Sequence, residues 1–267
     1  MEKIAIIGVG NIGEALLQGL IASEVEPRHL IATCRSEERV AALAERYAVQ
    51  ATTDNVEAAT DADVVFLCVK PNQVIDVIGE IAETVAGNSV PTVLVSMAAG
   101  VDIADMEEAI SSAGTPIMRV MPNTPMLVGK GVLAVSAGRY VEDEQREGVE
   151  KLLASAGRVV AVPEKAMHAV TALSGSGPAY YFLLTEALID AGVALGLPRD
   201  LATELATQTC AGAGALLDQH PDPVGLRAAV SSPGGTTVAA IRELEESSLR
   251  AAIYRATDAC ATRSEEY

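Results

Sequence analysis

Short apolar runs rich in β-branched residues alternate with longer helical patterns over roughly the first 160 residues, and this alternation restricts the fold more than any other feature. Each predicted strand is continuously apolar, as strands of a parallel sheet are when helices cover both faces. The predicted strands are 3–8, 29–34, 64–69, 92–96, 117–121, 131–136 and 158–162, and the predicted helices between them are 12–22, 37–47, 72–86, 102–113 and 142–156. The pattern predicts an α/β domain built on a mostly parallel, doubly wound sheet.

The pattern changes near Pro163, after which strand signals stop and Ala/Leu-rich helical patterns follow one another. The predicted helices are 163–172, 177–195, 198–219, 222–231, 235–246 and 248–264. We therefore predict two domains, an α/β domain over residues 1–162 and an all-α domain over residues 163–267.

Small residues recur at helical spacing in the second domain, and they let helix backbones approach closely. They are Ala202, Ala206, Cys210, Ala213 and Gly214. A helical domain of about 100 residues with few large aromatic side chains has difficulty building a thick core alone. We therefore favour a homodimer formed through the helical domain, and tight packing inside one subunit is the alternative.

The chain of 267 residues carries 36 acidic against 19 basic residues, a formal net charge of −17. Nucleic acids and anionic membranes bind clustered Lys and Arg, so neither is an expected partner. The apolar runs are strand-sized, and the first residues do not form the apolar core of a signal peptide, so a cytoplasmic protein is expected. The four cysteines, without a CxxC pair or a Cys/His cluster, predict neither a metal site nor a disulfide framework.

A glycine-rich motif, Gly8-Val9-Gly10-Asn11-Ile12-Gly13, lies where the first predicted strand ends and the first helix begins. In that context Gly8 permits a tight turn, Gly10 lets a pyrophosphate approach the backbone, and Gly13 lets helix and strand pack closely. The free N–H groups at the helix start favour a negatively charged ligand. The motif predicts a Rossmann-type dinucleotide-binding domain, with every motif residue except Val9 a candidate cofactor contact.

The second predicted strand ends in Thr33-Cys34-Arg35-Ser36 rather than in an acidic residue. An NAD-selective site normally places Asp or Glu there, to accept a hydrogen bond from the ribose 2′-hydroxyl. The Arg35 guanidinium can instead clamp a 2′-phosphate, and Ser36 can donate a further hydrogen bond. We therefore favour NADP(H) and keep NAD(H) as the alternative. Ser36 is also a good N-cap for the helix that starts at Glu37, and the two roles are compatible.

Further cofactor candidates lie at the edge of the sheet where such ligands bind. Val69, Lys70 and Pro71 end the third predicted strand. Lys70 could sit near the ribose or the phosphates, although a surface lysine that merely closes a strand is equally expected. Asn55 is a weaker candidate for the adenosine half of the cofactor.

Several segments together resemble the pyrroline-5-carboxylate reductase family over essentially the whole chain. The most specific is Val230-Ser231-Ser232-Pro233-Gly234-Gly235-Thr236-Thr237, followed by Val238-Ala239-Ala240-Ile241 and Leu244-Glu245. Supporting segments are Met121-Pro122-Asn123-Thr124-Pro125, Ser174-Gly175-Ser176-Gly177-Pro178-Ala179-Tyr180 and Cys68-Val69-Lys70-Pro71. The resemblance implies reduction of 1-pyrroline-5-carboxylate to L-proline by hydride transfer from NAD(P)H, the final step of proline biosynthesis. It also implies dimers that interleave their helical domains, and it leaves a larger ring of dimers open.

The resemblance also assigns residues to the reacting end of the cofactor and to catalysis. Residues Ala98, Ala99, Gly100 and Asn123 would follow strands at the nicotinamide end. Thr237 would bond through its hydroxyl to the ring nitrogen of the substrate, as the proton donor. Because a threonine hydroxyl is a weak acid, it would relay a proton from water or orient an already protonated imine.

The substrate that the family implies carries a carboxylate, which needs a compact anion site. Gly234 and Gly235 open a predicted helix and leave N–H groups accessible at its positive end. The hydroxyls of Ser232, Thr236 and Thr237 add donors. From the residues alone, an ordinary Gly/Thr helix start without a ligand is the alternative. The assignment requires this loop to face the nicotinamide ring across a gap that fits one five-membered ring.

Two other functions compete with this interpretation. A 3-hydroxyacid dehydrogenase shares the two-domain plan but needs a lysine shortly after a Gly-rich turn of the helical domain, where Gly177 is followed here by Pro178-Ala179-Tyr180-Tyr181. A non-catalytic NADP-sensing protein would need the first domain but not the anion site. His168, on a predicted helix, is expected to be structural, with proton donation near the nicotinamide as the alternative.

Overall fold

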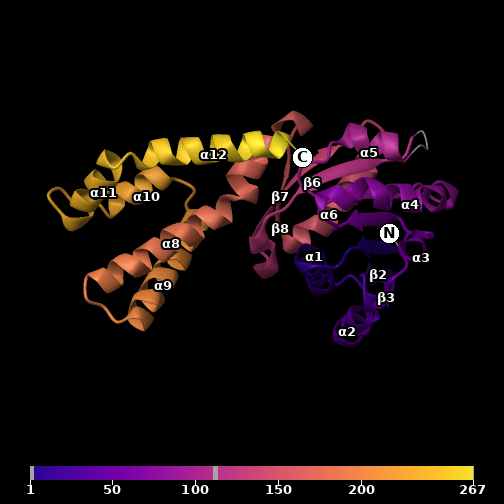
Figure 1. Cartoon of the computed structure of the whole chain (residues 1–267), viewed down its shortest axis with the longest axis horizontal. Helices are drawn as coiled ribbons and strands as arrows, with labels where there is room; N and C mark the ends of the chain where they lie inside the picture. The colour runs from indigo at the N-terminus through magenta and orange to yellow at the C-terminus, as the bar shows by residue number, and fades with distance from the viewer. Residues whose placement is uncertain (1–2, 111–113, 267) are drawn as a thin grey trace. The chain divides into compact units, whose positions relative to one another are not determined.

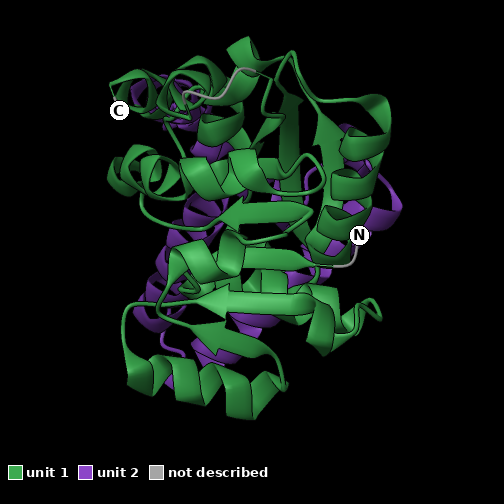
Figure 2. Cartoon of the chain, turned by 90° about the vertical axis from the view of Figure 1, so that its right-hand side faces the viewer, with its two compact units in different colours: residues 1–175, 260–267 green, residues 176–259 purple. Residues whose placement is uncertain are grey.

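The computed structural model describes residues 3–110 and 114–266, so the end of the predicted helix 102–113 lies outside the described residues. The chain divides into two compact units, residues 1–175 with 260–267 and residues 176–259, which Figure 2 colours separately. The boundary predicted after residue 162 falls where the last strand ends, whereas the first unit continues to residue 175. Each unit is described by itself below.

The first unit contains an eight-stranded sheet in the order β3-β2-β1-β4-β5-β6-β7-β8 (Figure 1). Its strands are β1 (Ile4–Ile7), β2 (Leu30–Thr33), β3 (Gln50–Thr52), β4 (Val64–Leu67), β5 (Val93–Ser96), β6 (Ile117–Met121), β7 (Gly131–Ala137) and β8 (Gly157–Ala161). All neighbouring strands are parallel except β6 and β7, which confirms the predicted mostly parallel sheet. Strand β3 was not predicted, because it has only three residues and lies at the edge without an apolar run.

Helices cover both faces of this sheet because successive residues of each strand point to opposite sides. Ile4 and Ile6 of β1 join one apolar cluster, with side chains of α1 (Asn11–Ala22), α2 (Glu37–Tyr47) and α6 (Asp143–Leu153). Ala5 and Ile7 join the other, with side chains of α3 (Asn55–Ala59), α4 (Val74–Gly87) and α5 (Ile103–Ala109). Both clusters are mainly aliphatic, as the scarcity of aromatic residues predicts.

The order of the strands places the functional edge of the sheet. The chain runs outward from β1 to β2 and β3, then returns to β4 on the other side of β1. In open α/β sheets, ligands bind beyond the carboxyl ends of the strands at such a switch point. The glycine-rich motif after β1 and the segment after β4 both lie there.

The segment after β8 is less regular than the single helix predicted over 163–172. It consists of a 3₁₀ turn (Glu164–Ala166), the short helix α7 (Met167–Val170) and a π-helical turn (Thr171–Gly175). The hydroxyls of Thr171 and Ser174 donate to carbonyls four residues earlier, a pattern that disturbs regular helical geometry. His168 Nδ1 lies 3.1 Å from the buried Ser264 Oγ, so it ties α7 to the end of the chain.

The second unit contains helices throughout, as predicted: α8 (Gly177–Ala194), α9 (Arg199–Gln219), α10 (Pro223–Ala229), α11 (Thr236–Glu246) and the first part of α12 (Leu249–Glu265). Helices α8 and α9 approach closely where a Cβ on Gly192 would lie 3.1 Å from Ala202 Cβ. Many large apolar side chains of this unit are exposed in the single chain, among them Tyr181, Phe182, Leu183, Leu195 and Tyr254. Contiguous exposed apolar surface of this kind marks sites of protein association. None of the helices in the described residues is long and apolar enough to cross a membrane.

Arg119 is a charged residue inside the first unit. It lies on β6 with 2% of its surface exposed, and its guanidinium pairs with Asp102, just before α5, and with Glu164 Oε1 at 3.3 Å. Glu164 also accepts a hydrogen bond from the Ile103 N–H at 2.7 Å. A buried arginine is costly unless it is paired, so this network fixes the sheet to α5 and to the segment after β8.

Replacing Arg119 with Ala should lower the free energy of unfolding by about 2–4 kcal/mol, because a buried side chain is removed and the half-buried Glu164 carboxylate and the Asp102 carboxylate lose their cation. Urea denaturation of the purified protein measures the change. Arg28→Ala is the control, since Arg28 pairs with Glu26 at 2.7 Å where the two side chains are 72% and 57% exposed. Such exposed pairs contribute about 0.2–1 kcal/mol, so equal losses in the two variants would contradict the role of Arg119.

Candidate active site

The glycine-rich turn after β1 is held between two neighbouring strands. Gly8 has a φ of +84°, and a Cβ there would lie 2.5 Å from Val69 Cγ1. The N–H groups of Gly8 and Val9 both donate to the carbonyl of Thr33, at 3.2 and 2.8 Å. A side chain at Gly8 would therefore clash with Val69, at the point where the chain turns away from the sheet.

Gly10 and Gly13 serve different needs at the start of α1. A Cβ on Gly10 would meet nothing within 4 Å, so the backbone there is open to an approaching group. A Cβ on Gly13 would lie 3.2 Å from both Cys68 Cβ and Gly8 O, so the helix can approach the sheet only without a side chain. No side chain caps α1 at Gly10, and the first N–H groups of the helix, including those of Asn11 and Ile12, point to this open side. This geometry fits a dinucleotide pyrophosphate.

A chain of hydrogen bonds braces the turn from β2. The Thr33 hydroxyl accepts from the Gly8 N–H at 3.2 Å and donates to Asn55 Oδ1 at 2.8 Å. Asn55 Nδ2 in turn donates to Glu80 Oε2 at 2.9 Å. The structure thus engages Asn55, a predicted adenosine contact, in support of the glycine-rich turn. The supporting roles of Thr33 and Glu80 were not predicted, since nothing in the local sequence pattern links the two residues.

Arg35 and Ser36 follow β2 at the same edge, and both are exposed. Ser36 is the N-cap of α2, where its hydroxyl accepts from the Arg39 N–H at 3.4 Å, so the predicted capping role is confirmed. Arg35 leaves its guanidinium at the surface beside the start of this helix. The contact of this pair with a 2′-phosphate stays a prediction.

Glu14, in the first turn of α1, joins that helix to α2. Its carboxylate accepts hydrogen bonds from Tyr47 Oη at 2.6 Å, from Arg46 Nη1 at 3.1 Å and from Arg39. The hydrogen bond from Tyr47 lowers the pKa of Glu14 in spite of its burial, and burial together with this bond raises the pKa of Tyr47. The cluster fixes the distance between the two helix starts that flank the site. The cluster was not predicted. The sequence signal that could have indicated it is the two-turn spacing of Arg39 and Arg46 on one face of α2.

Three more strand ends bring candidates to this edge. Val69, Lys70 and Pro71 follow β4, residues 98–100 follow β5, and Asn123 follows β6. Of these, Lys70 is exposed and Ala98 is buried, Ala99 is half-buried, and Gly100 turns the chain with a φ of +76°. Burial raises the pKa of the neighbouring Cys68 thiol to about 12, so this thiol is no nucleophile at neutral pH.

The side chain of Asn123 makes two hydrogen bonds within the first unit. Its Oδ1 accepts from the Val132 N–H at 2.8 Å, and its Nδ2 donates to the Ser174 carbonyl at 3.0 Å. Asn123 therefore clamps the end of β6 to β7 and to the π-helical turn.

The predicted anion site lies in the second unit, at the start of α11. The Gly235 N–H donates to the Ser232 carbonyl at 3.0 Å, and Gly234 has a φ of +73°, as in a type II turn with Pro233 at its second position. A Cβ on Gly235 would lie 2.5 Å from Ser232 Oγ and 3.0 Å from the Ser232 carbonyl oxygen, so the space at this position is tight.

No side chain caps α11, whose N-cap is Gly235. The first N–H groups of the helix are thus available, beside the exposed Thr236 and the half-buried Thr237. The helix dipole and the two hydroxyls favour a small anion at this end.

Comparison with known proteins shows which protein family the chain resembles. Residues 164–267 match the family model described as pyrroline-5-carboxylate reductase dimerisation, and residues 3–100 match the model described as NADP oxidoreductase, coenzyme F420-dependent. The pyrroline-5-carboxylate reductase of Corynebacterium melassecola is 57% identical over 267 residues, which cover 100% of this chain and 98% of the relative.

Solved structures agree with this similarity. A pyrroline-5-carboxylate reductase from Coxiella burnetii superimposes with a TM-score of 0.92 at 36% identity, covering 99% of this chain and 98% of that one. The Plasmodium falciparum pyrroline carboxylate reductase with NADP bound superimposes with a TM-score of 0.86 at 31% identity, covering 100% and 98%.

The doubly wound sheet, the open glycine-rich turn and the helical second unit define a two-part oxidoreductase that binds a nicotinamide dinucleotide. The sequence identity to the curated relatives over the whole length then shows to which family of oxidoreductases the chain belongs. The chain belongs to the pyrroline-5-carboxylate reductase family.

Substitutions at Gly10, the N-cap of α1, and at Gly13 in its first turn should separate cofactor binding from folding. Gly10→Ala should leave the melting temperature unchanged, because its Cβ meets no protein atom, but it should weaken NADPH binding about tenfold or more by filling the approach to the backbone. Gly13→Ala should instead cost about 1–3 kcal/mol of stability through overpacking against Cys68. Thermal melts and fluorescence titration with NADPH measure both effects. Unchanged NADPH binding by Gly10→Ala would contradict the placement of the pyrophosphate.

Proposed function

We propose that this chain reduces 1-pyrroline-5-carboxylate to L-proline by hydride transfer from NAD(P)H, the final step of proline biosynthesis. The observation that carries the proposal is the uncapped start of α11, with two threonine hydroxyls, in a member of a reductase family. An NADP-sensing protein would not need this anion site, and a 3-hydroxyacid dehydrogenase would need a lysine after Gly177.

The first unit holds the cofactor. Gly8 and Gly10 admit the pyrophosphate to the N–H groups at the start of α1, with Asn11, Ile12 and Gly13. Lys70 and the strand ends after β5 and β6 provide the surface for the ribose and nicotinamide. When bound, the reduced nicotinamide supplies the hydride for the carbon of the substrate C=N bond.

NADP(H) is the favoured form of the cofactor. Arg35 makes no ion pair with the described residues and offers its guanidinium beside Ser36, where an NAD site carries a carboxylate. The relative from Plasmodium falciparum with NADP bound supports this preference. Glu37 and Glu38, in the next turn, reduce the positive potential at this point, so NAD(H) stays the alternative.

The start of α11 binds the substrate. Its free N–H groups and the hydroxyls of Ser232 and Thr236 receive the carboxylate, since a helix N-terminus favours an anion. Gly234 and Gly235 keep the approach to the backbone free. Fixing the carboxylate orients the ring, and orientation is the main contribution that the protein makes to this reaction.

Thr237 acts at the ring nitrogen. Its Oγ1 bonds to the nitrogen, which gains a proton as the neighbouring carbon gains the hydride. Because a threonine hydroxyl is a weak acid, it passes on a proton from water or orients an imine that is already protonated.

The helical unit forms the homodimer, and a larger ring of dimers stays open. The match of residues 164–267 to a dimerisation model supports the dimer, as do the exposed apolar side chains of α8 and α9. The net charge of −17 supports the expectation that nucleic acid is not a partner. We also propose a cytoplasmic location.

Arg35→Ala tests the cofactor preference. Loss of charge-assisted hydrogen bonds of about 1.5–3 kcal/mol should weaken NADPH binding roughly tenfold to hundredfold and leave NADH binding within about twofold. The Kd of each cofactor, titrated by fluorescence, gives the comparison. An equal loss for NADPH and NADH would remove Arg35 from the 2′-phosphate site.

Thr237→Ala tests the catalytic assignment. We expect kcat/KM for 1-pyrroline-5-carboxylate to fall about a hundredfold, since positioned proton transfer contributes on that scale, with the Kd of NADPH unchanged. Oxidation of NADPH followed by absorbance measures the rate. Thr237→Ser, which retains the hydroxyl, should recover most of the activity. Full activity of the alanine variant would exclude the role, and an inactive wild-type protein would refute the proposed function.

A further inference from the structure

The segment that we assign to substrate binding, residues 232–237, is joined to two short helices with thin apolar packing. Helix α10 has 7 residues and α11 has 11, and neither contains a buried residue in the single chain. Apolar contacts within the chain therefore restrain the segment little. Within the single chain, polar contacts contribute to holding its orientation.

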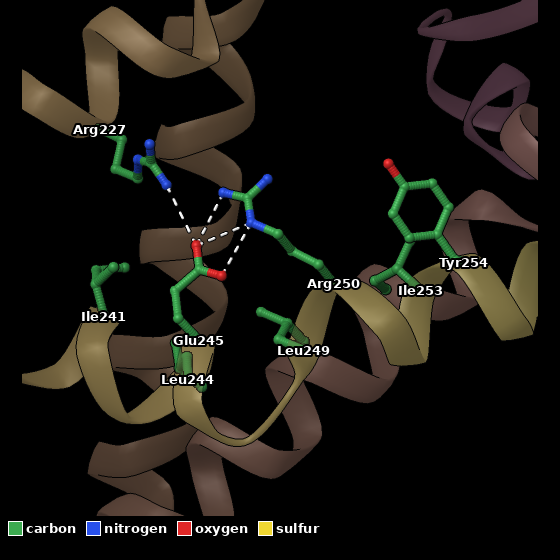
Figure 3. A pocket seen from close by; sticks show the side chains of 8 residues that line it. All are labelled: Arg227, Ile241, Leu244, Glu245, Leu249, Arg250, Ile253 and Tyr254. Atoms are coloured by element: carbon green, nitrogen blue, oxygen red, sulfur yellow. Dashed lines mark hydrogen bonds and ion pairs between the residues drawn. The ribbon is translucent and has the colours of Figure 1, made fainter.

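The carboxylate of Glu245, near the end of α11, is the meeting point of three helices (Figure 3). Arg250 of α12 binds it in a bidentate manner, with Nε 3.0 Å from Oε1 and 2.9 Å from Oε2, and Nη2 2.8 Å from Oε1. Arg227 of α10 places Nη1 3.7 Å from Oε1. Hydrogen bonding from Arg250 lowers the pKa of Glu245, so the carboxylate stays charged at neutral pH.

These ion pairs bridge a groove rather than a packed contact. The groove has a volume of about 500 Å³, and apolar side chains line it between the charged groups, namely Ile241, Leu244, Leu249, Ile253 and Tyr254. The side chains of Glu245, Arg227 and Arg250 are 42%, 44% and 65% exposed. Exposed ion pairs add little to stability, but a bidentate guanidinium–carboxylate pair fixes geometry.

The position of Glu245 on its helix links it to the substrate segment. Glu245 follows Thr237 by two turns and Ile241 by one. With 3.6 residues per turn, Glu245 and Thr237 are separated by only about 80° around the helix axis. Fixing the Glu245 carboxylate from two sides therefore limits rotation of α11 about its axis, and this rotation sets the direction of the Thr237 hydroxyl.

We propose that Glu245 is a positioning residue for the reaction: held by Arg250 and Arg227, it sets the rotation of α11 and thereby aims Thr237 and the free N–H groups at the substrate. The inference rests on the proposed function, because it concerns the segment to which that function assigns the substrate.

The test compares Glu245→Gln with Glu246→Gln in the full-length protein. Both variants remove one negative charge from the same turn of α11, but Glu246 makes no ion pair with the described residues. The measurements are KM and kcat for 1-pyrroline-5-carboxylate, the Kd of NADPH, the melting temperature and the mass of the assembly by light scattering. Arg250→Lys is added because it keeps the charge and loses the bidentate geometry.

We expect Glu245→Gln to raise KM and lower kcat/KM by about tenfold or more, with the Kd of NADPH and the assembly mass unchanged, because misaligned groups lose rate steeply. Glu246→Gln should stay within about twofold of the wild type, and Arg250→Lys should be intermediate. Wild-type kinetics in Glu245→Gln, or a parallel loss of NADPH binding and assembly, would overturn the inference while wild-type activity still upheld the proposed function. An inactive wild-type protein would overturn both.

Discussion

The close approach of α1 to the sheet is the constraint on which the first unit depends. Gly13 leaves no room for a Cβ between the helix, Cys68 and the Gly8 carbonyl. The helix start is therefore pressed against the carboxyl ends of β1 and β4, where the order of the strands reverses. The hydrogen bonds from Gly8 and Val9 to Thr33, and the Glu14 cluster with α2, then fix the neighbouring loops around this point. Displacing α1 would displace the candidate pyrophosphate contacts at its start, Asn11, Ile12 and Gly13.

The two proposed binding sites share one feature, a helix that begins without a side-chain cap. A helix that begins without a side-chain cap, after glycines with little steric demand, leaves N–H groups for an anion. At α1 we propose a pyrophosphate, and the surrounding backbone is held by buried strands. At α11 we propose a small carboxylate, and neither α10 nor α11 has a buried residue in the single chain. The first site is thus rigid through its core, whereas the second depends on ion pairs and on the association that the exposed apolar helices invite.

The sequence predicted those features that depend on local pattern. Continuous apolar runs located seven strands, and the glycine spacing located the turn at Gly8, because burial and backbone sterics act directly on residue type. The three-residue strand β3 was not predicted, because pairing at a sheet edge needs no apolar run. The hydrogen bonds that link Thr33, Asn55 and Glu80, and the Glu14 cluster, were not predicted for another reason. They join residues 22 to 33 positions apart, which only the folded chain brings together.

The central claim is that α11 binds the substrate carboxylate through its free N-terminus. A crystal structure of the full-length protein with NADP⁺ and L-proline tests it most directly. We expect the proline carboxylate to accept hydrogen bonds from the backbone N–H groups of Thr236 and Thr237. The ring nitrogen should lie within hydrogen-bonding distance of Thr237 Oγ1. Proline bound at any other place, with the start of α11 occupied by solvent alone, would contradict it.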